Sequence, residues 1–187
     1  WEVIRAAGTK PFGFMPFWPG PGLGGHCIPI DPFYLTWKAK EFGISTRFIE
    51  LAGEINRSMP RYVVSKLQDC LNAFSKPLKG SKILILGLAY KSDIDDMRES
   101  PSLELMKLLE DKGACVDFHD PLIPKIGITR EYQQFADRTS QEIDSGYDCF
   151  LLATKHSAFS AQQILSFGVP IIDTRNFFPK HPLVYPA

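Results

Sequence analysis

Hydrophobic residues in the second half of the chain follow two alternating patterns. Short, wholly apolar runs bounded by glycine or proline are typical of strands buried on both faces of a parallel sheet. The segments between them repeat apolar residues at the three- and four-residue spacing of amphipathic helices. This alternation predicts an α/β fold, with a Rossmann-like, doubly wound parallel sheet. The predicted strands are 82–87, 114–118, 147–153 and 170–173, the predicted helices are 99–113 and 158–167, and 121–146 is predicted to hold loops and at most a short helix.

The first half of the chain has helical periodicity and no strand pattern. A helix is predicted to end near Gly8. Another is predicted to begin at Asp31-Pro32, because aspartate favours the N-cap and proline the first helical position. That helix is predicted to end at Gly43, since glycine readily takes the left-handed conformation that closes helices.

Residues 46–75 form the longest periodic stretch, and two interpretations remain open for it. It is either one helix kinked at Pro60, or two helices of which the second is capped by Ser58. A turn with proline and glycine follows, which indicates a domain boundary. We therefore expect a helical segment over 1–76, followed by a Rossmann-like domain over 77–187.

Composition and charge exclude several classes of function. The 187 residues contain 21 Lys and Arg against 21 Asp and Glu, which offers no overall attraction for nucleic acid or an anionic membrane. No apolar run approaches the roughly 18 residues of a membrane span. The four cysteines form no CxxC pair and no zinc-like spacing, so we expect no metal site, and their scatter suits a reducing cytoplasm. Three of them, Cys70, Cys115 and Cys149, are predicted to lie on core faces.

The stretch 19–31 concentrates the candidate chemistry. It places four glycines and three prolines around Cys27, so the loop is stiff and lets a ligand approach the backbone closely. A rigid loop that presents a thiol suits a nucleophile, although a single cysteine is more often a packed small hydrophobe. Asp31 is likewise open to two interpretations, as a helix cap or as a catalytic carboxylate, and the two are compatible. The loop aromatics before Pro19 either pack against protein or contact a ligand.

The string Gly24-Gly25-His26-Cys27-Ile28-Pro29-Ile30-Asp31 resembles the active-site loop of the UDP-glucose/GDP-mannose dehydrogenases. The longer string from Lys10 to Cys27 is most similar to the bacterial branch of UDP-N-acetyl-D-glucosamine (UDP-N-acetylhexosamine) 6-dehydrogenases. A second string, from Gly87 to Pro101, is similar to another signature of this family. The resemblance implies an NAD-dependent enzyme that oxidises the C6 alcohol of a UDP-sugar to a carboxylate in two steps.

The resemblance also implies roles for individual residues. Cys27 is expected to form a thiohemiacetal and then a thioester, with Asp31 orienting or activating water. Arg98 is expected to reach toward NAD. His26 is the neighbour of Cys27, but its role as a base is left open. The residues expected to bind the UDP-sugar are Phe17, Gly20, Gly22, Gly24, Lys91 and Arg175.

Members of the family carry a GxGxxG fingerprint and a catalytic lysine in an N-terminal Rossmann domain, and this sequence has no such fingerprint. We therefore expect the chain to be the carboxy-terminal part of a longer enzyme and to be inactive alone. The family resemblance further implies a homodimer through residues 46–74. The alternative function is a UDP-sugar-binding or dimerisation module without catalysis of its own.

Overall fold

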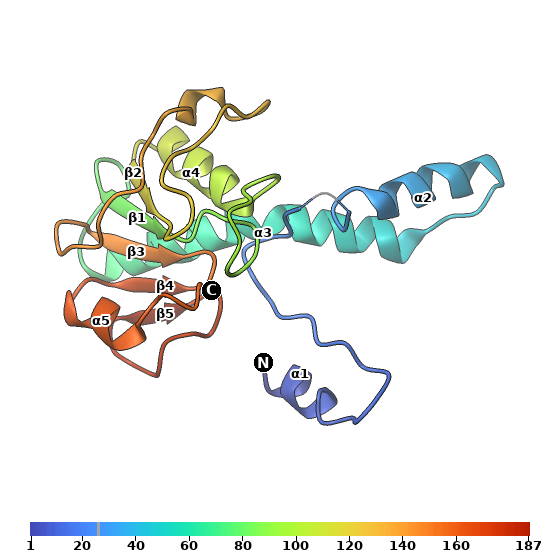
Figure 1. Ribbon diagram of the computed structural model, residues 1–187, viewed down its shortest axis with the longest axis horizontal. Coiled ribbons are helices and arrows are strands. Elements are labelled where there is room, and N and C mark those ends of the chain that lie inside the picture. The colour runs from blue at the N-terminus through green and yellow to red at the C-terminus, as the bar shows by residue number, and fades with distance from the viewer. Residues whose placement is uncertain (26) are drawn as a thin grey trace.

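Residues 77–187 build a five-stranded sheet in which every neighbouring pair of strands is parallel. The computed structural model describes residues 1–25 and 27–187, so the question about His26 lies outside the described residues. The strand order is β2-β1-β3-β4-β5, which confirms the predicted parallel α/β sheet (Figure 1). The strands are β1 (Lys82–Leu86), β2 (Cys115–His119), β3 (Cys149–Leu152), β4 (Ile171–Asp173) and β5 (Val184–Pro186).

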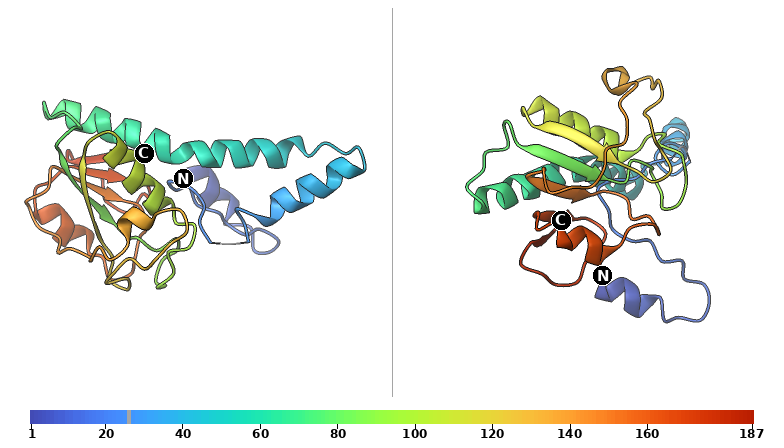
Figure 2. Two further views of the ribbon diagram at one scale, coloured as in Figure 1. Left: turned by 90° about the horizontal axis from the view of Figure 1, so that it is seen from above. Right: turned by 60° about the vertical axis from the view of Figure 1, so that its left-hand side comes forward.

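The sheet is covered on both faces because its central strands are apolar on both. In β1, Ile83 and Ile85 join the core shared with α3 and α4, whereas Leu84 and Leu86 join the core shared with α5. Successive side chains of a strand point to opposite faces, so a wholly apolar run requires cover on each. Figure 2 shows α3 along one face and α5 on the other. The helices are α1 (Glu2–Ala7), α2 (Asp31–Glu41), α3 (Arg47–Ala73), α4 (Pro101–Asp111) and α5 (Ala161–Ser166), with a short 3-10 helix, η1 (Gln133–Phe135).

The stretch after residue 46 is one helix, α3, which runs through Pro60. Its second half packs on the sheet, with Val63, Val64 and Leu67 in the core. Its first half extends beyond the sheet and pairs with α2, so that the two helices form a projecting arm (Figure 1). The expected boundary at residue 77 stays a prediction, since α3 contributes to the core of the sheet.

The predicted N-cap role of Asp31 is wrong. The N-cap position of α2 is Ile30, and no side-chain hydrogen bond caps the helix. The reason is a turn just before the helix, in which the amides of Ile30 and Asp31 donate to the carbonyl of Cys27 at 3.1 and 2.8 Å. This turn shifts the start of the helix, so Asp31 stands in its first turn with an exposed side chain.

Two further expectations need correction. Cys115 is exposed, whereas Cys70 and Cys149 are buried as predicted. Cys115 begins the edge strand β2, where alternate side chains face outward. The strand β5 was not predicted, because it has three residues and ends in Pro186, a residue that edge strands tolerate.

Candidate functional site

The glycine-rich loop lies across the edge of the sheet where the parallel strands end. The amide of Gly25 donates to the carbonyl of Arg98 at 3.0 Å, which ties the loop to the segment between β1 and α4. A Cβ atom at Gly20 would lie 2.6 Å from Arg175 Cζ, and one at Gly24 would lie 2.9 Å from the Glu99 carbonyl oxygen. A side chain at Gly24 would meet a backbone atom, and one at Gly20 would require Arg175 to move, so both glycines are contact points between the loop and the sheet domain.

A cleft of about 420 Å³ opens beside this contact. Its walls come from α1, from the loop and from the segments that follow β1, β3 and β4. Ligands of open α/β sheets bind beyond the carboxyl ends of the strands, which is where this cleft lies. Its lining residues are Trp1, Arg5, Trp18, Tyr90, Lys91, Ser92, Thr154, Lys155, Arg175 and Asn176.

The charge of the cleft is wholly positive. Arg5, Lys91, Lys155 and Arg175 line it, and no Asp or Glu is among the described residues that line it. Four cationic groups around one cleft favour an anionic ligand, since like charges close together need a counter-ion. Because the chain as a whole is neutral, this clustering is a local property of the site.

Arg175 is held in place by backbone carbonyls. Its Nε donates to the Ala153 oxygen at 2.6 Å, and its Nη1 lies 3.5 Å from the Pro19 oxygen. Asp173 accepts a hydrogen bond from the backbone amide of Arg175 at 2.9 Å. Burial lowers the pKa of Arg175 to about 10. A guanidinium desolvated in this way favours an anionic partner.

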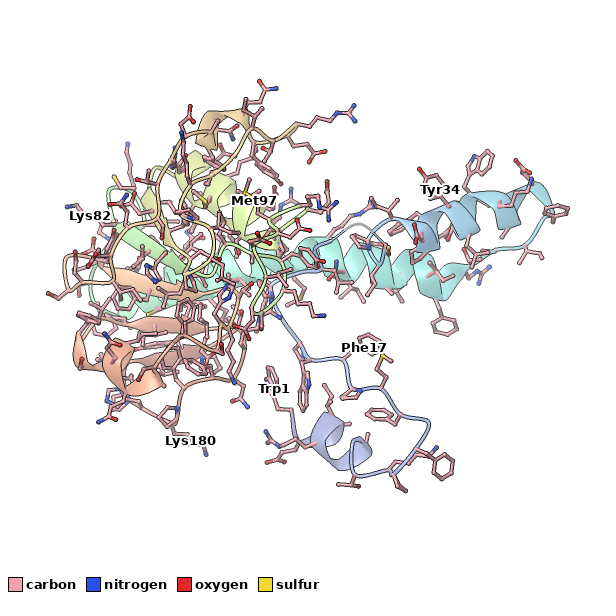
Figure 3. The ribbon with its side chains drawn as sticks, in the orientation of Figure 1. Trp1, Phe17, Tyr34, Lys82, Met97 and Lys180 are labelled. Carbon is pink, nitrogen blue, oxygen red and sulfur yellow. The ribbon has the colours of Figure 1, made fainter. Side chains whose placement is uncertain are left out.

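One wall of the cleft is aromatic. The rings of Trp1 and Trp18 stack with centroids 5.4 Å apart and planes 17° apart. Trp1 precedes α1 and Trp18 belongs to the loop, so this stack joins the start of the chain, where Figure 3 labels Trp1, to the loop. Lys155 also lines the cleft, and its ammonium group lies 5.1 Å from the centroid of the Phe177 ring.

The structure brings together some of the predicted site residues and separates others. Gly20, Lys91 and Arg175 meet at the cleft. Gly22 and Gly24 pack against Pro101 and Tyr90, on the sheet domain. Phe17 is exposed and is not among the cleft-lining residues. Sequence reasoning missed Arg5, Thr154, Lys155 and Asn176, of which the last three follow strand ends as Lys91 and Arg175 do.

Cys27 and Asp31 lie together at the far end of the same loop. Both are exposed, and the 2.8 Å hydrogen bond from the Asp31 amide to the Cys27 carbonyl fixes their backbones relative to each other. Cys27 is in no disulfide. Two residues before it, Gly25 is anchored to Arg98, so the thiol is carried by a segment fixed at both ends.

Arg98 is exposed and engages a carboxylate. Its Nε donates to both oxygens of Asp96 at 3.0 and 2.9 Å, and its Nη2 donates at 2.6 Å. The hydrogen bonds with Asp96 raise the pKa of Arg98. The loop after β1 lacks the paired glycines that cradle a pyrophosphate, so this chain offers a dinucleotide one exposed guanidinium and no backbone cradle there.

A larger cavity of about 820 Å³ lies on the opposite side of the loop, between α3, α4 and the segment around Tyr132. Arg57 and Arg61 line it together with Glu99, Glu104 and Glu131. Its mixed charge does not select an anion. We therefore assign the candidate ligand site to the smaller, wholly cationic cleft.

Across residues 1–25 and 27–187, no group of three or more His, Cys, Asp or Glu side chains is arranged to hold a metal ion. In the same part of the chain, no helix combines the length and the apolar character that a membrane crossing requires.

Comparison with known proteins matches nearly the whole chain to one family. Residues 1–58 match the central domain, and residues 84–180 the UDP-binding domain, of the UDP-glucose/GDP-mannose dehydrogenase family. A UDP-N-acetyl-D-mannosamine dehydrogenase from Methanococcus maripaludis is 35% identical over 85% of this chain and 34% of its own length. A UDP-N-acetyl-D-glucosamine 6-dehydrogenase from Pseudomonas aeruginosa is 35% identical over 89% of this chain and 39% of its own.

Solved structures agree with this match. The UDP-D-ManNAc dehydrogenase of Pyrococcus horikoshii superposes with a TM-score of 0.78 at 28% identity, covering 99% of this chain and 43% of that one. The UDP-glucose dehydrogenase of Pyrobaculum islandicum superposes with a TM-score of 0.75 at 26% identity, covering 98% of this chain and 41% of that one. The fold is therefore Rossmann-like. The chain spans about a third of the length of the first two relatives.

Proposed function

The chain belongs to the UDP-glucose/GDP-mannose dehydrogenase family, and from this premise we propose that it is the carboxy-terminal, UDP-sugar-binding portion of an NAD-dependent nucleotide-sugar 6-dehydrogenase. We further propose that its substrate is a UDP-N-acetylhexosamine, since relatives with such names align over most of this chain. The observation that carries the proposal is the cationic cleft beside the Cys27 loop.

The cleft has the chemistry that a UDP moiety requires. A nucleoside diphosphate presents a compact group of negative oxygens, which four cationic side chains can bind through charge-assisted hydrogen bonds. Arg175, with its Nη groups directed toward Gly20 and Pro19, is placed where the loop meets the sheet. The tryptophan pair offers a flat apolar surface for a base or sugar ring. With the diphosphate in the cleft, the sugar extends along the loop toward Cys27.

Cys27 supplies the nucleophile of the proposed reaction. Oxidation of the C6 alcohol gives an aldehyde, to whose carbon the Cys27 sulfur adds to form a thiohemiacetal. Loss of the remaining C6 hydrogen as hydride, together with release of the hydroxyl proton to solvent, gives a thioester. Water then attacks the carbonyl carbon, the carbon–sulfur bond breaks, and the carboxylate leaves while the thiol is restored. Asp31, exposed and fixed beside Cys27, orients this water.

NAD, when bound, accepts the hydride that leaves C6 in each of the two oxidations. On this chain the group proposed to contact it is Arg98, whose guanidinium is exposed and adjacent to the anchored Cys27 loop. The loop after β1 offers no cradle for a pyrophosphate. The proposal therefore assigns most of the NAD contacts to residues beyond this chain.

The second candidate is a UDP-sugar-binding and dimerisation module without chemistry of its own. It is favoured because the chain aligns with only 34% and 39% of the lengths of the two dehydrogenase relatives. We propose in addition that the protein acts as a homodimer in the reducing cytoplasm. The proposed compartment rests on the sequence, in which the four cysteines are widely scattered and form no CxxC pair.

The experiment that tests the proposal uses the complete enzyme that contains this chain. Cys27→Ser should abolish formation of the uronic acid and leave UDP affinity within about twofold of the parent, because a serine hydroxyl is a weaker nucleophile than a thiol but nearly the same size. Product analysis with UDP-N-acetylglucosamine and UDP-N-acetylmannosamine measures the outcome. Carboxylate production at the parent rate would overturn the covalent role. Absence of acid formation by the parent would favour the module.

A further inference from the structure

A fully buried histidine connects the segments that follow three neighbouring strands. His156 comes after β3, is 0% exposed, and lies between Asp93, which follows β1, and Asp120, which follows β2. None of these three residues lines the cationic cleft. A buried polar group must have partners, so this cluster needs a reason to exist in the core.

The hydrogen bonds define one tautomer of His156. The backbone amide of Asp93 donates to Nδ1 at 3.1 Å, so Nδ1 carries a lone pair and no proton. Nε2 lies 3.1 Å from Oδ2 of Asp120 and therefore donates its proton there. The carboxylates that face it are Asp93, whose Oδ1 lies 3.8 Å from Nδ1, and Asp120.

Asp120 and His156 bind opposite ends of segment 88–93, Asp120 at its start and His156 at its end. Oδ2 of Asp120 accepts from the amides of Leu88 and Ala89 at 2.7 and 2.9 Å. The hydroxyl of Thr154 donates to the Ala89 carbonyl at 2.7 Å. Segment 88–93 is thus fixed near its start by Asp120 and Thr154 and at its end by His156.

The same segment carries two groups of the candidate site. Lys91 lines the cationic cleft, and Tyr90 lies against Gly24 and Gly25 of the loop that bears Cys27. Displacement of segment 88–93 would therefore move a cation of the cleft and one support of the Cys27 loop together.

We propose that His156 is a positioning residue for the UDP-sugar site, which holds segment 88–93 so that Lys91 faces the cleft and Tyr90 supports the Cys27 loop. The inference rests on the proposed function for the identity of the ligand. It extends that function to a residue that touches neither ligand nor loop. Asp120 acts in the same cluster as the acceptor that fixes the tautomer.

Three substitutions separate the two hydrogen bonds of the imidazole. His156→Asn keeps an acceptor at the position of Nδ1 and loses the donor to Asp120. His156→Gln places its amide near Nε2 and leaves the Asp93 amide without an acceptor. His156→Leu removes both. Ile164→Ala is the control for lost stability, because Ile164 is the buried residue of α5 and packs on the other face of the sheet.

Calorimetry with UDP gives the first readout. His156→Leu and His156→Gln should weaken UDP binding about tenfold, the effect of one misplaced charge-assisted contact, whereas His156→Asn should stay within about threefold of the parent. Ile164→Ala should lower the melting temperature without changing UDP affinity. Hydrogen exchange gives a second readout that needs no ligand, since the Asp93 amide should lose protection in the Leu and Gln variants and keep it in the Asn variant.

A double-mutant cycle tests whether His156 acts through Lys91. In a Lys91→Ala background, His156→Leu should weaken UDP binding by less than about twofold, because the contact it positions is already absent. An equal loss of affinity in both backgrounds would overturn the inference, as would parent-like UDP affinity in His156→Leu. If Lys91→Ala itself leaves UDP affinity unchanged, the assignment of the ligand site is wrong. Independently of the ligand, equal protection of the Asp93 amide in all three His156 variants would overturn the positioning role.

Discussion

At the scale of single residues, the cationic side chains of the cleft differ in how they are held. Lys91 is exposed on a flexible stem, whereas Arg175 is half-buried and bound to the Ala153 carbonyl. Each should contribute a charge-assisted contact to a bound diphosphate. The difference in burial means that only Arg175 should also affect folding when it is replaced.

We predict that Lys91→Ala and Arg175→Ala each weaken UDP binding by about 1.5–3 kcal/mol, as measured by isothermal titration calorimetry. Lys112→Ala, an exposed lysine that ends α4 away from the strand ends, is the matched control and should bind UDP as the parent does. Arg175→Lys keeps the charge but not the planar fork, so it should recover part of the affinity. Unchanged affinity in either alanine variant would remove that residue from the site.

The glycines of the loop allow it to lie against the sheet domain more closely than residues with a side chain could. Gly24→Ala would place a methyl group against Tyr90 and 2.9 Å from the Glu99 carbonyl oxygen. We predict that the variant lifts the loop, weakens UDP binding severalfold and lowers the melting temperature. Gly127→Ala is the matched control, since its nearest neighbour would be Met97 Cε at an ordinary 3.5 Å. A Gly24→Ala protein with parent stability and affinity would contradict the docked position of the loop.

At the scale of elements, the strand ends are held by carboxylates that accept backbone amides. Asp120 accepts from Leu88 and Ala89 with one oxygen and from Leu122 and Ile123 with the other. Burial alone would raise the pKa of Asp120, but the hydrogen bonds from His156 and the amides outweigh it and lower that pKa. A lowered pKa means that the folded state prefers the ionised carboxylate.

This preference makes stability depend on pH in a defined direction. The contribution of Asp120 is fully present above the unfolded pKa of about 3.9 and is lost as pH falls through the lower pKa of the folded protein. We predict that Asp120→Asn lowers the free energy of unfolding by about 2 kcal/mol at pH 7, and that the difference from the parent shrinks below about pH 4. Urea denaturation at several pH values measures it. Asp69→Asn, at an exposed position of α3, is the control, and its effect on the free energy of unfolding should not vary with pH in this way. If the destabilisation by Asp120→Asn were the same at every pH, the proposed role of the ionised carboxylate would be contradicted.

The elements also show what the sequence could and could not predict. The central strands β1 and β3 followed from apolar runs, because a strand buried on both faces needs apolar side chains on each, whereas the edge strand β2 alternates exposed and buried residues. Lys91 and Arg175 could be found because they follow predicted strands, and Lys155 follows β3 in the same way but was not considered. Asp31 was misplaced because the preceding turn closes on the Cys27 carbonyl, a backbone contact that leaves no mark in the sequence.

At the scale of the whole molecule, the projecting arm has apolar side chains that the single chain does not cover. The buried residues of α3 all lie from Pro60 onward, whereas Phe48, Leu51 and Ile55 in its first half are exposed. On α2, Leu35 and Trp37 are exposed as well. A large exposed apolar surface is typical of a protein–protein interface, which agrees with the proposed homodimer through residues 46–74.

We predict that the chain is a dimer at tens of micromolar in size-exclusion chromatography with light scattering, and that Phe48→Asp converts it to a monomer, because a buried unpaired charge opposes association. Ile128→Asp is the matched control, since Ile128 and Phe48 are each 90% exposed but Ile128 lies outside the arm. A monomeric parent, or a Phe48→Asp variant that stays dimeric, would contradict this interface.

The central claim is that a UDP-sugar in the cationic cleft reaches the thiol of Cys27. The rate of alkylation of each cysteine by iodoacetamide, followed by peptide mass spectrometry, tests it most directly. Cys27 and Cys115 are both exposed, so both should react quickly, while the buried Cys70 and Cys149 react slowly. UDP-N-acetylglucosamine at about ten times its dissociation constant should slow alkylation of Cys27 roughly tenfold and leave Cys115 unchanged. Equal rates at Cys27 with and without saturating UDP-sugar would contradict the claim.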